Sequence, residues 1–290
     1  MLETFGSRPT VVVTGVSSGI GKALVNLLAT SGYDVFGSVR KPEDADALSN
    51  ELGDQFHRMV FDVRNREDIQ KAAKNVEAHL KGRTLRGLIN NAGLAAIGPL
   101  ECLGDESFET SIAVNLLGVR NVTNAFLPML RGTSSDAPGK IVNISSLSGI
   151  LNTPMNGAYC VSKHALESLG EVYRRELMPA GIDVVSIRSG PIQSEIWNKS
   201  EPEETAYADP AYQQMAHNAR QIMHHAEEDA LPASVIAETV DDILQGRKNR
   251  TAYHLSKGAW ISRVLAAMPD RWADRLIMRS LMKPNRPGPR

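Results

Sequence analysis

The sequence predicts an α/β protein in which one doubly wound parallel sheet has helices on both faces and is followed by a helical C-terminal extension. Three observations support this fold class. Short β-branched runs alternate with helically spaced segments along most of the chain, which implies right-handed crossovers and parallel strands. A glycine-rich turn connects the first run to the first helical segment. The length of 290 residues is within reach of a single large α/β domain.

Each expected element rests on a local pattern. Residues 10–15, TVVVTG, are a β-branched run that ends in glycine, as buried strands often do. Residues 21–32 have helical spacing and stop at a glycine. By the same criteria, further strands are expected at 33–40, 57–63, 85–93, 139–146, 181–191 and about 251–256. Further helices are expected from about residue 43 and at about 65–81, 105–130, 157–178 and 233–246.

The chain divides into one domain and an extension. We expect a Rossmann-like domain over residues 8–255 and an amphipathic helical extension with a flexible tail over 256–290. Residues of about 195–231 are polar and contain several prolines, so we expect an irregular loop that shapes a substrate pocket. The apolar stripes of the extension predict a pocket lid or a subunit contact, with peripheral membrane contact as the minor alternative.

Composition excludes several classes of protein. The net charge of −1 offers no general attraction to nucleic acid. No stretch approaches the roughly 20 apolar residues of a membrane span, and the N-terminus lacks a signal pattern, so we expect a cytoplasmic protein. The two cysteines have no metal-like spacing. His224 and His225 are adjacent rather than one turn apart, and we expect no metal site.

The turn after the first strand is suited to a phosphate group. Its sequence, TGVSSGIG, lies between a strand and a helix, where glycines allow close approach and the helix N-terminus attracts an anion. The spacing G-x-x-x-G-x-G differs from the common dinucleotide fingerprint. A tight turn without a ligand is the plainer alternative. If the turn binds a dinucleotide cofactor, the residues expected to contact it are Gly15, Ser17, Ser18, Gly19, Ile20 and Gly21.

The end of the second strand indicates which dinucleotide is preferred. The segment reads SVRKPED, and Val39 stands where an NAD-dependent protein would place an acid. Arg40 and Lys41 follow, and a guanidinium can grip a 2′-phosphate with two hydrogen bonds. We therefore expect NADP, with NAD as the alternative. The plainer interpretation is a pair of solvated cations at a strand end.

The segment NGAYCVSKHA carries Tyr159 and Lys163 four residues apart. In a helix these side chains share one face. Many such pairs are only solvated neighbours, so the spacing alone leaves the role of Tyr159 open.

Five motifs in order give this chain a strong resemblance to the short-chain dehydrogenases/reductases. They are TGVSSGIG at 14–21, NNAG at 90–93, Asn115 in VNLLG, ISS at 144–146 and YCVSK at 159–163. The resemblance covers about 10–255 and is similar to the branch that contains 17β-hydroxysteroid and retinol dehydrogenases. Ser146 lies 13 positions before Tyr159, which is the usual separation in that family.

The resemblance implies a catalytic set of Asn115, Ser146, Tyr159 and Lys163. Tyr159 would give a proton in reduction and take one in oxidation, and the Lys163 ammonium would lower its pKa from about 10. Lys163 would also hold the nicotinamide ribose. Ser146 would orient the substrate oxygen. Asn115 would interrupt a helix and hold a water in a proton relay.

The resemblance also implies further cofactor contacts. Asp62 and Val63 would flank the adenine, and Asn91, Ala92 and Gly93 would line the adenosine ribose. After the sixth strand, Ser189-Gly190 replaces the usual Pro-Gly and is followed by Pro191. The backbone of Ile192 would reach the nicotinamide amide and Ser194 a phosphate.

These expectations lead to an NADP(H)-dependent oxidoreductase that interconverts a ketone or aldehyde and an alcohol. The branch suggests a bulky apolar substrate such as a steroid, retinoid or lipid. One alternative is a non-catalytic NADP(H)-binding sensor or scaffold, which the retained Ser146, Tyr159 and Lys163 disfavour. Another is an isomerase or dehydratase, but the longer substrate domain of such relatives is missing. The family habit is a homodimer or homotetramer.

Overall fold

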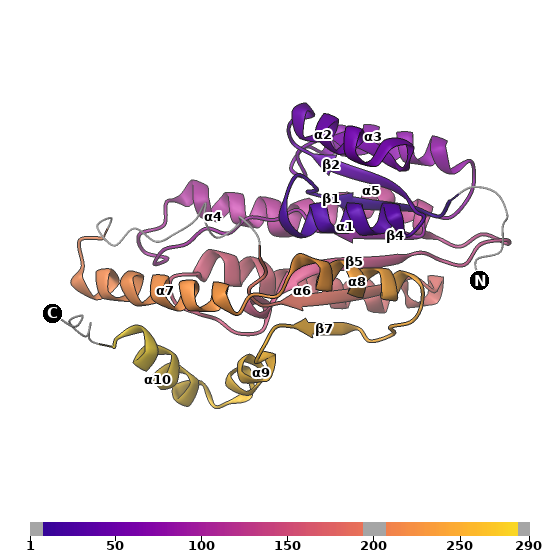
Figure 1. Cartoon of the computed structure of the whole chain (residues 1–290). Coiled ribbons are helices and arrows are strands. Elements are labelled where there is room, and N and C mark those ends of the chain that lie inside the picture. Colours follow the sequence, from indigo (N-terminus) through magenta and orange to yellow (C-terminus); the bar gives the residue numbers. More distant parts are fainter. Residues whose placement is uncertain (1–7, 194–206, 284–290) are drawn as a thin grey trace.

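The computed structural model describes residues 8–193 and 207–283, and its centre is one seven-stranded sheet (Figure 1). All neighbouring strands are parallel, in the order β3-β2-β1-β4-β5-β6-β7, which confirms the predicted fold class. The strands are β1 (Thr10–Thr14), β2 (Asp34–Val39), β3 (Phe56–Val60), β4 (Gly87–Asn90), β5 (Lys140–Ser146), β6 (Asp183–Ser189) and β7 (Ala252–Leu255).

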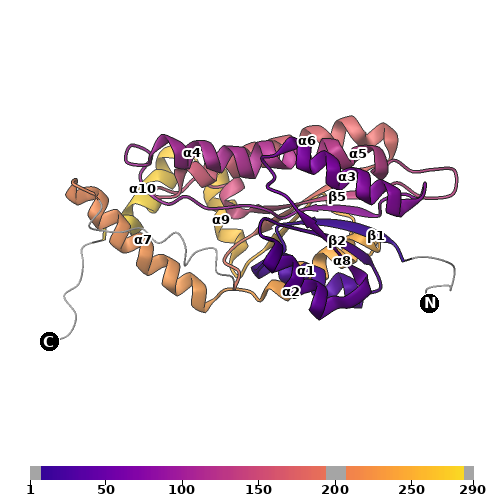
Figure 2. The same ribbon diagram turned by 90° about the horizontal axis from the view of Figure 1, so that it is seen from above.

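Helices cover both faces of the sheet and make three layers (Figure 2). One face carries α1 (Gly19–Thr30), α2 (Pro42–Leu52) and α8 (Ala233–Leu244). The other carries α3 (Arg66–Leu80), α5 (Val119–Leu130) and α6 (Gly157–Leu177). This arrangement follows from the parallel order, because each crossover has to return over one face of the sheet.

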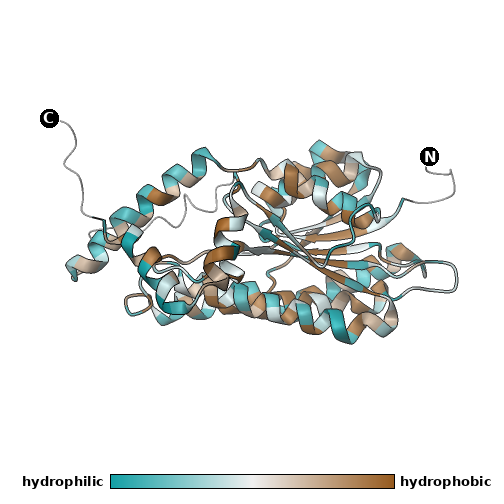
Figure 3. Cartoon of the chain, turned by 90° about the horizontal axis from the view of Figure 1, so that it is seen from below, coloured by the Kyte–Doolittle hydropathy of each residue, from teal (hydrophilic) through white to brown (hydrophobic). Residues whose placement is uncertain are grey.

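The central strand shows how the sequence fills both layers. All five residues of β1 are buried. Val11 and Val13 join the apolar cluster on the side of α1 and α8, whereas Val12 joins the cluster on the side of α3 and α5. A strand that is covered on both faces reads as a continuous apolar run for this reason. Figure 3 shows the apolar residues gathered on the strands and the hydrophilic ones on the outer helix surfaces.

The long helix expected at 105–130 is present but is not regular. It begins as α4 (Asp105–Ile112), widens into a π-helical turn, η2 (Ala113–Gly118), and continues as α5. Such turns are rare and are frequently found at functional sites. The widened turn carries Asn115.

The irregular loop expected at about 195–231 is partly wrong, because α7 (Pro210–Glu228) fills much of it. Asp209 caps this helix by accepting a hydrogen bond of 2.7 Å from the Ala211 N–H. Pro210 occupies the first helical position, where its missing N–H costs nothing. Pro232 likewise comes directly before α8. Pro210 and Pro232 therefore mark where helices begin.

The extension forms α9 (Ala259–Ala267) and α10 (Asp270–Leu281), which lie beyond β7 (Figure 1). The α10 end is tied to α7, since the Asn218 amide donates to the carbonyl oxygens of Leu281 at 2.6 Å and Lys283 at 3.0 Å. None of the helices in the described ranges combines the length and the apolar character needed to span a bilayer.

Candidate active site

A cavity of about 670 Å³ opens at the carboxyl ends of the strands, and α7 and α9 contribute to its far wall. This is the edge where open parallel sheets bind ligands. Of the residues predicted to bind cofactor or substrate, Lys41 and Asn115 do not line it, and Ser194 lies outside the described residues. The others do: Gly15, Ser17, Ser18, Gly19, Ile20, Gly21, Arg40, Asp62, Val63, Asn91, Ala92, Gly93, Ser146, Tyr159, Lys163, Pro191 and Ile192.

The turn before α1 has the shape of a phosphate cradle. Gly15 and Gly19 have φ values of +70° and +54°, which only glycine adopts readily. A Cβ on Gly21 would lie 2.0 Å from the Gly15 carbonyl oxygen. Ser18 precedes the helix and makes no capping hydrogen bond. The turn therefore leaves helix N–H groups and a hydroxyl for an anion, so the donors fit the pyrophosphate of a dinucleotide.

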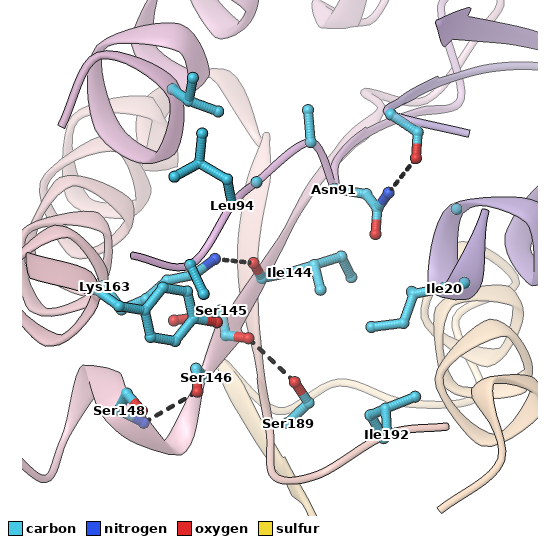
Figure 4. Close-up of a pocket in the computed structure, with 18 of the residues that line it drawn as sticks. Ile20, Asn91, Leu94, Ile144, Ser145, Ser146, Ser148, Lys163, Ser189 and Ile192 are labelled. Carbon is cyan, nitrogen blue, oxygen red and sulfur yellow. Dashed lines mark hydrogen bonds between the residues drawn. The ribbon is translucent and has the colours of Figure 1, made fainter. Parts of the chain in front are cut away.

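Thr14 and Asn91 fix the geometry of this turn. The Asn91 side chain donates to the carbonyl oxygens of Thr14 at 2.9 Å and Gly15 at 2.7 Å, and Figure 4 marks one of these two hydrogen bonds. The Thr14 hydroxyl accepts from the N–H groups of Asn91 and Ala92, both at 3.0 Å. Asn91 thus holds β1 and β4 together below the cavity. The contribution of Thr14 was missed in the sequence, because a threonine at a strand end has no distinctive spacing.

Basic residues border the cavity at the ends of β2 and β3. Arg40 is exposed and lines the cavity, whereas the neighbouring Lys41 does not. Arg64 also lines it and was not predicted. Its guanidinium donates to both carboxylate oxygens of Asp62, at 3.0 and 2.8 Å. These hydrogen bonds lower the pKa of Asp62 despite its partial burial.

Tyr159 and Lys163 lie on the inner face of α6, and both are buried. The Lys163 Nζ atom is 5.5 Å from the centre of the Tyr159 ring. It donates a hydrogen bond of 2.9 Å to the Ile144 carbonyl oxygen on β5 (Figure 4). The four-residue spacing therefore joins two buried polar side chains at the cavity wall, which is not the arrangement of a solvated surface pair.

Burial dominates the electrostatics of this pair. It raises the pKa of Tyr159 to about 12, against an opposing hydrogen bond with Ser146. It lowers the pKa of Lys163 to about 8, against the opposing charge of Glu167. The expected lowering of the tyrosine pKa by the ammonium is therefore wrong for the protein without cofactor. The cost of burying a phenolate outweighs an ammonium that is directed toward a backbone carbonyl.

The two serines at the end of β5 differ in their surroundings. The Ser146 hydroxyl accepts a hydrogen bond of 3.1 Å from the Ser148 N–H and also contacts Tyr159. The Ser145 hydroxyl is buried without a hydrogen-bond partner among the described residues. Ser189 donates to the Ser145 carbonyl at 3.2 Å and so ties β5 to β6 (Figure 4). Of the two serines, Ser146 is the one whose hydroxyl contacts Tyr159.

The Asn115 side chain is fully engaged with the protein. Its oxygen accepts from the Leu94 N–H at 2.9 Å, and its amide donates to the Leu94 carbonyl at 2.8 Å and to the Ser162 hydroxyl at 2.9 Å. These bonds join the widened turn η2, the segment after β4 and α6. The side chain therefore braces the cavity wall from behind.

The outer half of the cavity is mainly apolar and was not predicted residue by residue. Its apolar side chains come from the segments after β4 and β5 and from α7, whose helix was not expected. Four-residue spacing within α7 was the only signal that could have indicated this wall. The residues are Leu94, Ala95, Val114, Leu147, Leu151, Ile222, Met223 and Ala226, with Thr110, Ser148, Thr153, Glu227 and Ser262 as polar neighbours.

Comparison with known proteins agrees with this geometry. Residues 9–205 match the family described as short chain dehydrogenase. The chain is 34% identical over 275 residues to an NADPH-dependent 3-dehydrocapnine reductase of Ornithobacterium rhinotracheale, covering 94% of this chain and 97% of the relative. It is 30% identical over 270 residues to retinol dehydrogenase 16 of Homo sapiens, covering 88% and 82%. A short chain dehydrogenase from Burkholderia cenocepacia in complex with NADP superposes with a TM-score of 0.71 at 25% identity, covering 96% and 99%.

Proposed function

The chain belongs to the short-chain dehydrogenase/reductase family of NAD(P)-dependent oxidoreductases, and from this premise we propose that it reduces the carbonyl group of a bulky apolar substrate with NADPH. One observation carries the proposal. Ser146, Tyr159 and Lys163 line the same cavity as the glycine turn. A proton donor and a phosphate cradle therefore open onto one space, as hydride transfer to a carbonyl requires.

Bound NADPH supplies the hydride, and the chain's own residues manage the substrate oxygen. The Tyr159 hydroxyl, kept protonated by burial, donates its proton to that oxygen as negative charge develops there. Ser146 donates a hydrogen bond to the same oxygen and orients the carbonyl. The Lys163 ammonium stabilises the phenolate that remains on Tyr159 and binds ribose hydroxyls. In the oxidative direction the phenolate takes the proton back.

NADP is the cofactor that the site favours. Arg40 lines the cavity where β2 ends, and no acidic side chain follows Val39 directly to repel a 2′-phosphate. The names of two similar proteins, an NADPH-dependent reductase and a dehydrogenase in complex with NADP, support the same cofactor here. NAD remains the weaker alternative.

The substrate class follows from the outer half of the cavity. Leucine, isoleucine, methionine and alanine side chains surround it, and a few hydroxyls and Glu227 are the polar exceptions. Binding there gains free energy chiefly from apolar area removed from water, about 25 cal/mol per Å². A retinoid, steroid or long-chain lipid ketone fits this lining, and relatives named for retinol and dehydrocapnine support that choice.

The division into a domain at 8–255 and an extension at 256–290 is part of the proposal. Ser262 of α9 lines the cavity, which supports a lid. A homodimer or homotetramer would use the outer faces of α5 and α6, and Val161 and Val172 on α6 are exposed. Such an assembly would cover apolar side chains that are otherwise in water.

The decisive experiment follows NADPH absorbance with purified protein and a panel of steroid, retinoid, lipid, quinone and small ketones. Turnover of long apolar ketones with a preference over small ones supports the proposal. Tight NADPH binding without turnover of any carbonyl would instead favour the non-catalytic sensor. Turnover of small ketones alone would keep the enzyme class and reject the substrate class.

A further inference from the structure

A second cluster of chemically active side chains lies at the amino ends of β2 and β3, whereas the cavity opens at the carboxyl ends of the strands. Asp34 is the first residue of β2, His57 lies in β3 and His79 lies near the end of α3. Phe36 pairs with His57 in the parallel register, and Asp34 shares the face of Phe36 because it is two residues earlier. The face covered by α3 therefore brings the three side chains together beside the first residues of β2.

The ligand-type atoms of this cluster converge. The His79 Nε2 atom is 3.3 Å from one Asp34 carboxylate oxygen, and the His57 Nε2 atom is 3.8 Å from the other. All three atoms lie within 4.8 Å of one another. The Asp34 side chain is only 11% exposed, and those of His57 and His79 are 30% and 29% exposed. The site is thus closed beneath and accessible from one side.

Two features favour metal binding by the imidazoles: their rings are oriented by packing, and one ring nitrogen lacks a hydrogen bond. Phe36 stacks on His57 with ring centres 4.5 Å apart and meets His79 edge-on at 5.1 Å, so one aromatic ring orients both. The His57 Nε2 atom is buried, and within the described residues the Asp34 oxygen 3.8 Å away is at ion-pair distance but too far for a hydrogen bond. A buried polar nitrogen without a partner is costly. The cost is removed if that nitrogen donates its lone pair to a cation.

We propose that Asp34, His57 and His79 bind one Zn²⁺ ion, with water as the fourth ligand. Two imidazoles and a carboxylate are a usual zinc donor set, with bonds of about 2.0–2.2 Å in a tetrahedron. Donor atoms of such a tetrahedron are about 3.3 Å apart, so the present cluster tightens slightly by rotation of the two partly exposed rings. The ion then joins β2, β3 and α3 and stabilises the folded state.

Other charged side chains face the Asp34 carboxylate and could pair with it in the absence of a metal ion. Arg8 Nη1 lies 3.6 Å from Asp34 and 3.5 Å from Asp54, with 42% of its side chain exposed. In the metal-free protein, Arg8 compensates the Asp34 charge. Zinc replaces this compensation, and Arg8 retains Asp54 as its partner. An ion-pair cluster without metal affinity is the alternative that has to be tested.

The test uses the full-length protein after treatment with a chelator. Equilibrium dialysis against Zn²⁺ is expected to give one equivalent bound, and Co²⁺ is expected to give the strong visible absorption of a tetrahedral site. His57→Ala and His79→Ala should each weaken binding at least about tenfold. The matched control is His224→Ala with His225→Ala, which removes two adjacent histidines of α7 and should leave the affinity unchanged.

Several results would overturn the proposal. One is a wild-type protein that binds no Zn²⁺ or Co²⁺, and another is a loss of binding in the control variant that equals the loss in the His57 and His79 variants. If an alanine variant does not fold, His79→Gln replaces it, because glutamine can keep a hydrogen bond to Asp34 and is a poor zinc ligand. Unchanged affinity in that variant also rejects the site. None of these readouts depends on the reductase activity.

Discussion

The ammonium of Lys163 on α6 donates a hydrogen bond of 2.9 Å to the carbonyl oxygen of Ile144 on β5. This contact crosses from helix to sheet beneath the cavity and holds a charged side chain that is only 5% exposed. A buried ammonium costs stability unless its partners offset the loss of water. The burial of the Lys163 ammonium therefore costs stability, and its proposed role in catalysis and cofactor binding would explain why it is buried.

Lys163→Met should reveal this cost, because the unfolding free energies of the wild type and of the variant should depend differently on pH. The pKa of Lys163 is lowered from 10.5 to about 8 by burial. Below about pH 8 the lysine is charged in the folded and unfolded states, so the cost is fully present. Between about pH 8 and 10.5 the unfolded chain binds more protons than the folded one, and the cost disappears as pH rises. The unfolding free energy of the wild type should thus rise relative to that of the variant by up to about 3 kcal/mol.

Urea denaturation of both proteins between pH 8 and pH 10 measures this difference. The upper limit avoids the ionisation of unfolded tyrosines, because the folded pKa of Tyr159 is about 12 and the wild type loses stability above pH 10 for that separate reason. Parallel curves for the two proteins would mean that Lys163 keeps its proton in the folded state across this pH range, so that burial does not lower its pKa. The variant should also lose NADPH affinity, since the proposed ribose contact is gone.

Tyr159→Phe should abolish carbonyl reduction and leave NADPH binding nearly unchanged. Phenylalanine keeps the buried ring and removes only the hydroxyl that gives the proton, a loss of roughly 10²–10⁴-fold for a general acid. Steady-state rates and NADPH fluorescence titration check the two halves of this expectation. Near wild-type turnover by the phenylalanine variant would assign the proton to another group.

Arg40→Ala should weaken NADPH binding roughly 10- to 100-fold and NADH binding much less, because only NADPH carries the 2′-phosphate. Lys41→Ala is the matched control. Lys41 follows Arg40 in the chain but does not line the cavity, so its loss should change both affinities little. Dissociation constants for both cofactors and all three proteins decide the matter. Equal weakening of NADPH and NADH would reduce Arg40 to an adenine contact.

The sequence could predict the features that depend on a few neighbouring residues, and it could not predict most of those that depend on contacts across the fold. The strands of the sheet can be recognised locally, because β1 has three consecutive buried valines and β6 has buried Val184, Val185 and Ile187. The phosphate turn and the pair of Tyr159 and Lys163 are also local patterns. Such features follow from spacing along a few residues, and the structure places them on a single cavity.

The features that were missed depend on distant contacts. The helix α7 is tied to the end of α10 through Asn218, and its polar sequence looked irregular without that partner. Arg64 was overlooked although its partner Asp62 is only two residues away, because its place on the cavity wall becomes visible only once the sheet is assembled. The direction of the Tyr159 pKa shift depends on how deeply the ring is buried, which spacing on one helix does not reveal. His57 and His79 meet Asp34 only after β2, β3 and α3 are assembled.

Asn115→Ala should destabilise the protein by about 2–4 kcal/mol. It deletes three hydrogen bonds and leaves the Leu94 N–H and carbonyl groups without these partners. Asn115→Asp keeps the acceptor for the Leu94 N–H and loses both donors, so it should also be destabilised. Thermal and urea denaturation compare the three proteins. If the alanine variant matches the wild type in stability and loses only activity, then Asn115 acts through a water relay and its bracing role is rejected.

Ser262→Phe should test whether α9 forms part of the substrate pocket. Ser262 lines the cavity, so a phenylalanine there should occupy space that a long apolar substrate needs. KM for the longest substrate of the panel should rise several-fold, and KM for a small ketone and for NADPH should change little. The matched control is Val264→Phe on the same helix, since Val264 is 50% exposed and does not line the cavity. A similar rise of KM in both variants would indicate a general disturbance of α9. No rise in either would leave the extension outside the pocket.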